Sequence, residues 1–161
     1  MKVTIHMAYS DTIRGALIRF FTWSKWNHVA IQINETVFDS TVERGVGMQS
    51  LKQFENEWKE IEPFSINIPN PQLAKKFLHE QIGKSYDITA IVGFIFKRNW
   101  SQDCCWFCSE LVAKSLREGG IDIKREEHRI SPRDIIFILN SFEKADFDVS
   151  DYEPKRTSTD Y

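Results

Sequence analysis

Two short runs of apolar and β-branched residues, separated by a turn, constrain the fold of this chain most. Residues 28–33 and 36–41 both have the composition of strands, and the intervening Asn34-Glu35 is typical of a tight turn. The two runs therefore predict a β-hairpin, with Ile33 opposite Thr36. A hairpin joins neighbouring strands in antiparallel order, so at least part of the core is predicted to rest on an antiparallel sheet.

The rest of the chain predicts further strands and several helices. Strands are expected at residues 3–9, 46–49 and 58–66. Apolar residues at helical spacing, together with capping residues, predict helices over residues 11–22, 51–57, 71–82, 86–97, 105–118 and 132–142. No repeat or linker divides the chain, so we expect one α+β domain over residues 1–148. The polar residues 149–161 are expected to form a mobile tail.

Composition narrows the class of protein. The chain has 161 residues and a net charge of −2, from 21 basic and 23 acidic residues, so nothing indicates nucleic acid or an acidic membrane as a partner. Three closely spaced cysteines do not resemble a secreted disulfide framework. The N-terminus lacks the apolar region of a signal peptide, and the apolar stretch near residues 91–96 is too short to span a bilayer. We expect a cytoplasmic protein without stable membrane insertion, with a phage protein or signal-independent export as alternatives.

Cys108 is the first candidate for chemistry. The run WFCSELV places it in the first turn of a predicted helix. Free backbone N–H groups at a helix start favour the thiolate form of a cysteine and can stabilise an oxyanion. The alternative is that Cys108 is a small buried apolar residue, because it shares a helical face with Leu111, Val112 and Leu116.

His28 and Asp39 are the candidates for the partners of that thiol. His28 begins a predicted strand next to the small Ala30, which leaves room for a helix to approach. In the hairpin register Ala30 lies opposite Asp39, so Asp39 shares a face with His28 and could orient its ring. A register shifted by one residue would bring Ser40 there instead.

Four short segments carry a resemblance to a known family. They are SKWNHVAI at 24–31, GKSYD at 83–87, WFCSELV at 106–112 and ISPRD at 130–134. In these segments and in their order, the chain resembles the circularly permuted branch of the NlpC-type papain-like superfamily. This branch includes the YiiX/YaeF-like proteins and, more distantly, lecithin:retinol acyltransferase-like proteins.

The resemblance implies a circularly permuted papain-like fold, in which a catalytic helix packs on an antiparallel sheet. It implies Cys108 as nucleophile, His28 as base and Asp39 as the polar third member of a triad. Family members commonly have Ser before the histidine, whereas this chain has Asn27. Tyr86 and Trp26 are expected to line the substrate cleft.

The expected function is that of a cysteine-dependent amidase or peptidase that acts through a thioester, with peptidoglycan-type peptides among the candidate substrates. A lipid-ester substrate would make the protein an acyltransferase or lipase, and loss of turnover would leave a binding module of the same fold. The Cys105-x-x-Cys108 spacing would also fit a redox pair or, with Cys104 and a histidine, a metal site. No cofactor or metal is expected.

Overall fold

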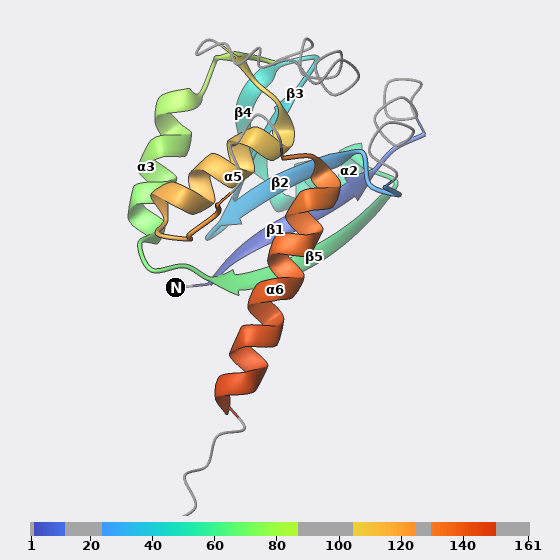
Figure 1. Cartoon of the computed structure of the whole chain (residues 1–161). Coiled ribbons are helices and arrows are strands. Elements are labelled where there is room, and N and C mark those ends of the chain that lie inside the picture. Colours follow the sequence, from blue (N-terminus) through green and yellow to red (C-terminus); the bar gives the residue numbers. More distant parts are fainter. Residues whose placement is uncertain (1, 12–23, 87–104, 125–129, 151–161) are drawn as a thin grey trace, which may run out of the picture.

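The computed structural model describes residues 2–11, 24–86, 105–124 and 130–150, with side chains described up to residue 142. Within these residues a five-stranded antiparallel sheet has the strand order β4-β3-β2-β1-β5 (Figure 1). The strands are β1 (Lys2–Tyr9), β2 (His28–Ile33), β3 (Thr36–Thr41), β4 (Gly45–Ser50) and β5 (Glu60–Asn67). A second, parallel pair is formed by β6 (Ser85–Tyr86) and β7 (Cys105–Trp106).

The described helices cover both faces of the sheet. They are α2 (Leu51–Glu57), α3 (Pro71–Gln81), α5 (Cys108–Glu118) and α6 (Pro132–Ser150). Figure 1 shows α3, α5 and α6 on one face and α2 behind the strands. The mixed helices and antiparallel strands confirm the predicted α+β class. No helix in the described ranges combines the length and apolarity needed to cross a bilayer.

The predicted hairpin of residues 28–41 is confirmed. Ile33 pairs with Thr36 and Ile31 with Phe38, as the turn at Asn34 requires. Asn34 has φ of 58°, a left-handed conformation that asparagine tolerates better than most residues. The hairpin register therefore follows from local turn chemistry.

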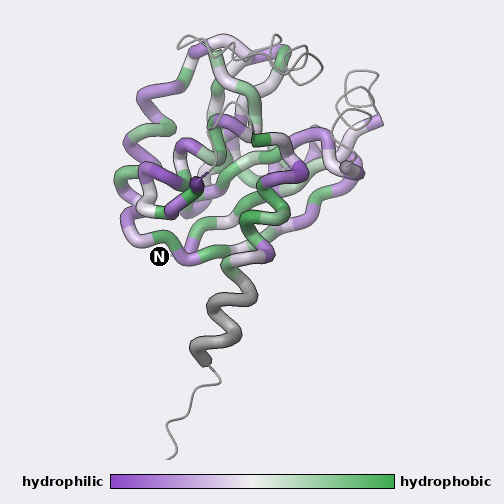
Figure 2. Tube along the Cα trace, in the orientation of Figure 1, coloured by the Kyte–Doolittle hydropathy of each residue, from purple (hydrophilic) through white to green (hydrophobic). Residues whose placement is uncertain are grey.

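Two apolar layers hold the helices against the sheet. On one side the core joins strand residues such as Ile5, Ile31 and Phe38 to α5 residues such as Leu111 and Leu116. On the other side a smaller cluster packs around Phe54 of α2, and it contains Ala8, Ala30 and Val37. Figure 2 shows hydrophobic stretches running through the central strands. The alternation of side chains along each strand thus assigns one face to α5 and the other to α2.

Three predicted boundaries are wrong. Residues 105–106 form β7 instead of a helix start, so α5 begins at Cys108. Tyr86 belongs to β6, because it pairs with Trp106, and does not begin a helix. Helix α6 continues to Ser150 instead of ending near residue 142, since residues 143–150 contain no Gly or Pro to stop it. The predicted helices over residues 11–22 and 86–97 fall almost entirely outside the described residues. So does most of the predicted tail over residues 149–161, of which residues 149–150 belong to α6.

Candidate active site

Cys108 is the first residue of α5 and has no exposed surface. The two residues before it are held in place from different directions. The Phe107 N–H donates to Glu110 Oε2 at 3.0 Å, which ties the chain to its own helix. The Ser40 hydroxyl donates to the Trp106 carbonyl at 2.8 Å, which ties the chain to β3. The sulfur therefore occupies a fixed place at the helix N-terminus, where the helix dipole and backbone N–H groups favour negative charge.

His28, the first residue of β2, contacts both a carboxylate and the thiol. Its Nε2 lies 3.0 Å from Asp39 Oδ2, and its side chain is also hydrogen-bonded to the Cys108 thiol. Because Nε2 is directed at Asp39, Nδ1 is the nitrogen left for the sulfur. The indole of Trp58, which directly follows α2, stacks on the imidazole with a centroid distance of 4.3 Å and an interplanar angle of 5°.

Asp39 lies inside the protein with 0% exposure. Besides His28, it binds Arg44, whose Nη2 lies 2.8 Å from Oδ1 and 2.9 Å from Oδ2. Ser40, the alternative partner of the histidine, points elsewhere, because its hydroxyl donates to the carbonyl of Trp106. Of the two neighbours in β3, it is Asp39 that contacts His28.

These contacts shift the pKa values of both partners. Burial alone would lower the pKa of His28, but the hydrogen bonds to Asp39 and Cys108 outweigh burial and raise it to about 9. Burial would raise the pKa of Asp39, but His28 and Arg44 outweigh it and lower the pKa. At neutral pH the site thus favours a carboxylate beside an imidazolium. An imidazolium next to a thiol at a helix N-terminus is an arrangement suited to nucleophilic attack on a carbonyl carbon.

Asn27 fixes the chain where it enters β2. Its side chain accepts a hydrogen bond from the Ser10 N–H at 3.2 Å and donates to the Ser10 carbonyl at 2.8 Å. The end of β1 and the start of β2 are therefore joined beside His28. The departure from serine at position 27 thus supplies a two-point contact that a serine side chain is too short to copy in the same way.

The two residues predicted to line the cleft lie in different settings. Trp26 is packed in the core, with 8% of its surface exposed, and the ammonium of Lys25 lies 4.6 Å from its ring centroid. Tyr86 is half-buried in β6, and its ring lies 5.6 Å from the ring of Phe107, the residue before Cys108. A contact of either residue with substrate stays a prediction.

Sequence reasoning missed Arg44 and Trp58. Arg44 lies in the turn between β3 and β4, where a charged residue is usually solvent-exposed. Trp58 falls between a helix and a strand, where an aromatic residue has no periodic pattern to join. Their roles depend on how α2 and the β3–β4 turn pack beneath the sheet, and no local signal in the sequence predicts that.

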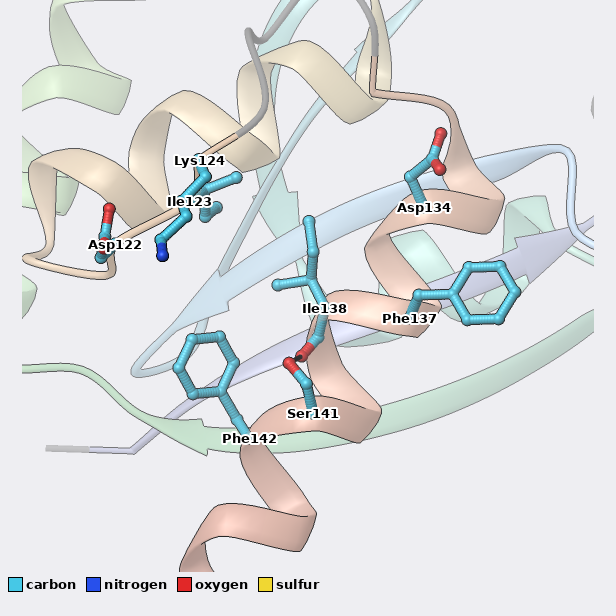
Figure 3. Close-up of a pocket in the computed structure, with 8 residues that line it drawn as sticks. All are labelled: Asp122, Ile123, Lys124, Asp134, Phe137, Ile138, Ser141 and Phe142. Atoms are coloured by element: carbon cyan, nitrogen blue, oxygen red, sulfur yellow. Dashed lines mark hydrogen bonds between the residues drawn. The ribbon is translucent and has the colours of Figure 1, made fainter.

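Other features of the described residues do not join this site. Cys105 and Cys108 are both free thiols, and no group of three metal-binding side chains occurs in the part of the chain that is described. A groove of about 480 Å³ runs between α6 and residues 122–124 (Figure 3). It is lined by Phe137, Ile138 and Phe142 among others, but by none of Cys108, His28 and Asp39.

The comparison with known families agrees with the fold. The sequence model of the Peptidase C92 family, described as permuted papain-like amidase enzymes of the YaeF/YiiX type, matches residues 8–133. This range is more than half of the chain and includes Cys108, His28 and Asp39. No curated protein sequence matches the chain. The predicted relationship to the permuted papain-like proteins is thereby confirmed, and the chain belongs to the C92 family of permuted papain-like amidases.

Proposed function

We propose that this protein is a cysteine amidase or peptidase in which Cys108 is the nucleophile, His28 the general acid and base, and Asp39 the residue that orients the histidine. The observation that carries the proposal is the position of His28, which is buried and contacts both the Cys108 thiol and the Asp39 carboxylate. Membership of an amidase family supports hydrolysis of an amide bond.

In the first half of the reaction, the proton of the Cys108 thiol already resides on His28, as the raised pKa of the ring favours, and the resulting thiolate attacks the carbonyl carbon of the amide. The carbonyl oxygen becomes an oxyanion at the N-terminus of α5, where the Cys108 N–H can donate to it. The imidazolium then gives its proton to the nitrogen of the leaving group. The C–N bond breaks, an amine leaves, and the acyl group remains on sulfur as a thioester.

In the second half, His28 takes a proton from water and the resulting hydroxide equivalent attacks the thioester carbon. The C–S bond breaks, a carboxylic acid is released, and the thiolate of Cys108 is left beside the imidazolium of His28, ready for the next cycle. Asp39 keeps Nε2 occupied throughout, so Nδ1 remains the nitrogen that exchanges protons. We propose small peptides, including peptidoglycan-type peptides, as substrates, with Tyr86 and Trp26 beside the cleft.

Selective alkylation provides the test, since exposure alone predicts the opposite result. Cys105 is partly exposed and Cys108 is fully buried, so an unactivated protein would be alkylated faster at Cys105. We expect iodoacetamide to label Cys108 faster than Cys105 at pH 7, as located by mass spectrometry. The variant His28→Gln should slow labelling at Cys108 at least tenfold and leave Cys105 unchanged.

Activity completes the test. A panel of peptide amides with a chromogenic leaving group should be hydrolysed by the wild type and not by Cys108→Ala. Faster labelling of Cys105 than of Cys108, or hydrolysis that survives Cys108→Ala, would contradict the proposal. Release of the acyl group to an added amine in preference to water would instead identify an acyltransferase.

A further inference from the structure

A second ion pair lies behind Asp39 and involves a residue that the proposed proton transfers do not use. The Arg44 guanidinium reaches Asp39 from the β3–β4 turn, and one nitrogen, Nη2, lies within 2.9 Å of both carboxylate oxygens. Oδ2 therefore accepts hydrogen bonds from Arg44 and from His28. Asp39 cannot turn away from the histidine without losing a charged partner as well.

The other end of the guanidinium is held by α2. Arg44 Nη1 lies 3.0 and 3.2 Å from the two carboxylate oxygens of Glu57, the last residue of that helix. The Gln49 side chain donates to the same carboxylate at 3.1 Å. Arg44 is thus fixed between one carboxylate from β3 and one from α2. A lysine offers a single nitrogen and cannot hold both carboxylates in this way.

Gly47 makes room for this arrangement. It is the partner of Asp39 in the β3–β4 pairing, and a Cβ built on it would lie 3.3 Å from Arg44 Cδ and Nε. The missing side chain lets the stem of Arg44 fold back from the turn across β4. The space for Arg44 is therefore built into the strand that borders Asp39.

Charge explains what this pair contributes. Among the described residues, the charged or titratable groups that contact His28 are Asp39 and Cys108, and those that contact Arg44 are Asp39 and Glu57. Without Arg44, the positive charge of His28 would be balanced by the buried Asp39 alone. With Arg44 present, Asp39 already has a counter-charge, and the imidazolium remains available to stabilise a negative sulfur.

We propose that Arg44 is a positioning residue that holds both oxygens of Asp39 and balances its charge, so that His28 can serve Cys108. The inference rests on the proposed role of Cys108 as nucleophile. A purely structural role for Arg44 would affect stability and leave the site chemistry unchanged, whereas a positioning role changes how His28 and Cys108 respond to pH.

The test uses four variants of the full chain and two measurements that need no substrate. Arg44→Gln removes the charge, Arg44→Lys keeps the charge without the double contact, and Lys76→Gln removes an exposed cation paired with Glu80. The measurements are the pH profile of Cys108 alkylation and the titration of the His28 ring by NMR. Arg44→Gln is expected to slow alkylation at pH 7 about tenfold, Arg44→Lys about threefold, and Lys76→Gln less than twofold.

The NMR titration separates this inference from the proposed function. In Arg44→Gln the His28 midpoint should rise by more than half a pH unit, because Asp39 loses its second counter-charge. If wild-type Cys108 is not preferentially alkylated, the proposed function fails. The NMR titration of His28 then decides by itself whether Arg44 positions Asp39. Glu57→Gln weakens the contact that holds Arg44 to α2, and it serves as the test if Arg44→Gln does not fold. It should slow alkylation of Cys108 about threefold. The inference would be overturned if a folded Arg44→Gln had the wild-type pH profile of Cys108 alkylation and the wild-type His28 midpoint. The same result in both Arg44→Lys and Glu57→Gln would also overturn it.

Discussion

Asp39 and Ser40 are neighbours in β3, and their side chains leave the strand on opposite faces. The carboxylate of Asp39 meets His28 and Arg44, whereas the hydroxyl of Ser40 meets the Trp106 carbonyl on the side of α5. One residue orients the proposed base and the next anchors the segment that carries the proposed nucleophile. This division follows from the two-residue period of a strand.

The residue pair gives a first prediction. Asp39→Asn should lower the pKa of His28 from about 9 toward its ordinary value of 6.5, because the ring loses its carboxylate partner. The rate of amide hydrolysis at pH 8 should fall about a hundredfold, since His28 would then be largely deprotonated and poorly oriented. NMR titration of the ring and a peptide-amide assay measure the two effects.

Ser40→Ala serves as the matched control for Asp39→Asn. It removes the hydrogen bond that the Trp106 carbonyl accepts from Ser40, at a cost of about 1–3 kcal/mol in the free energy of unfolding. The pKa of His28 should stay near 9, because Ser40 does not contact the ring. A fall of the His28 pKa in Ser40→Ala but not in Asp39→Asn would assign the orienting role to Ser40.

At the scale of elements, the strand pair β6–β7 depends on a close approach to β4. The Val46 N–H of β4 donates to the Lys84 carbonyl at 2.8 Å, and the Val46 carbonyl accepts from the Gly83 N–H at 2.9 Å. Gly45, just before Val46, has φ of 68°, and a Cβ on it would lie 2.2 Å from the Lys84 carbonyl oxygen. The absence of a side chain at Gly45 therefore sets how β6, and Tyr86 with it, sits beside the sheet.

A comparison of two glycines tests this contact. Gly45→Ala should lower the free energy of unfolding by the strain of a left-handed residue, about 1–2 kcal/mol, plus the cost of displacing Lys84. Gly83→Ala carries the same kind of strain, with φ of 87°, but a Cβ there has no neighbour within 4 Å. Urea unfolding should therefore show Gly45→Ala to be less stable than Gly83→Ala by at least about 2 kcal/mol. Equal losses in the two variants would mean that the contact with Lys84 is unimportant.

Elements whose bounds are set by nearby turn or capping residues could be predicted from the sequence. The hairpin of β2 and β3 follows from the turn at Asn34, and the start of α3 follows from Pro71. The pair β6–β7 could not be predicted, because each strand has two residues and its partner lies far along the chain. The contact between His28 and Asp39 could be predicted from the hairpin register. The contacts of Arg44 could not, because they depend on the packing of α2 against the β3–β4 turn.

At the scale of the whole molecule, buried charged groups couple folding to pH. The pKa of His28 is raised to about 9, so between pH 6.5 and 9 the folded protein holds a proton that the unfolded chain releases. Stability from this group is complete below pH 6.5 and is lost as the pH rises through 9. The pKa values of Asp39 and His6 are lowered, so their contributions are lost as the pH falls below 3.8 and 6.5 respectively.

The free energy of unfolding should therefore be greatest near pH 6.5. Between pH 6.5 and 9.5 it should fall by up to about 3 kcal/mol, as expected for a shift of this size at one group. Urea unfolding at several pH values measures the slope, and His28→Gln should flatten it over this range. A stability that rises between pH 6.5 and 9.5 would show that the sign of the His28 shift is wrong.

The two outer strands of the sheet bear on how a peptide could be recognised. An extended peptide can add to an open sheet edge through main-chain hydrogen bonds. Here the β5 edge carries Pro63, which has no N–H to donate, and two acidic residues, Glu60 and Glu62, that precede it. Both features oppose the addition of a further strand at this edge. On the β4 edge, Val46 is already bonded to Gly83 and Lys84. Under the proposed function, selectivity toward a peptide substrate is therefore expected from side-chain contacts around Cys108 and not from strand addition.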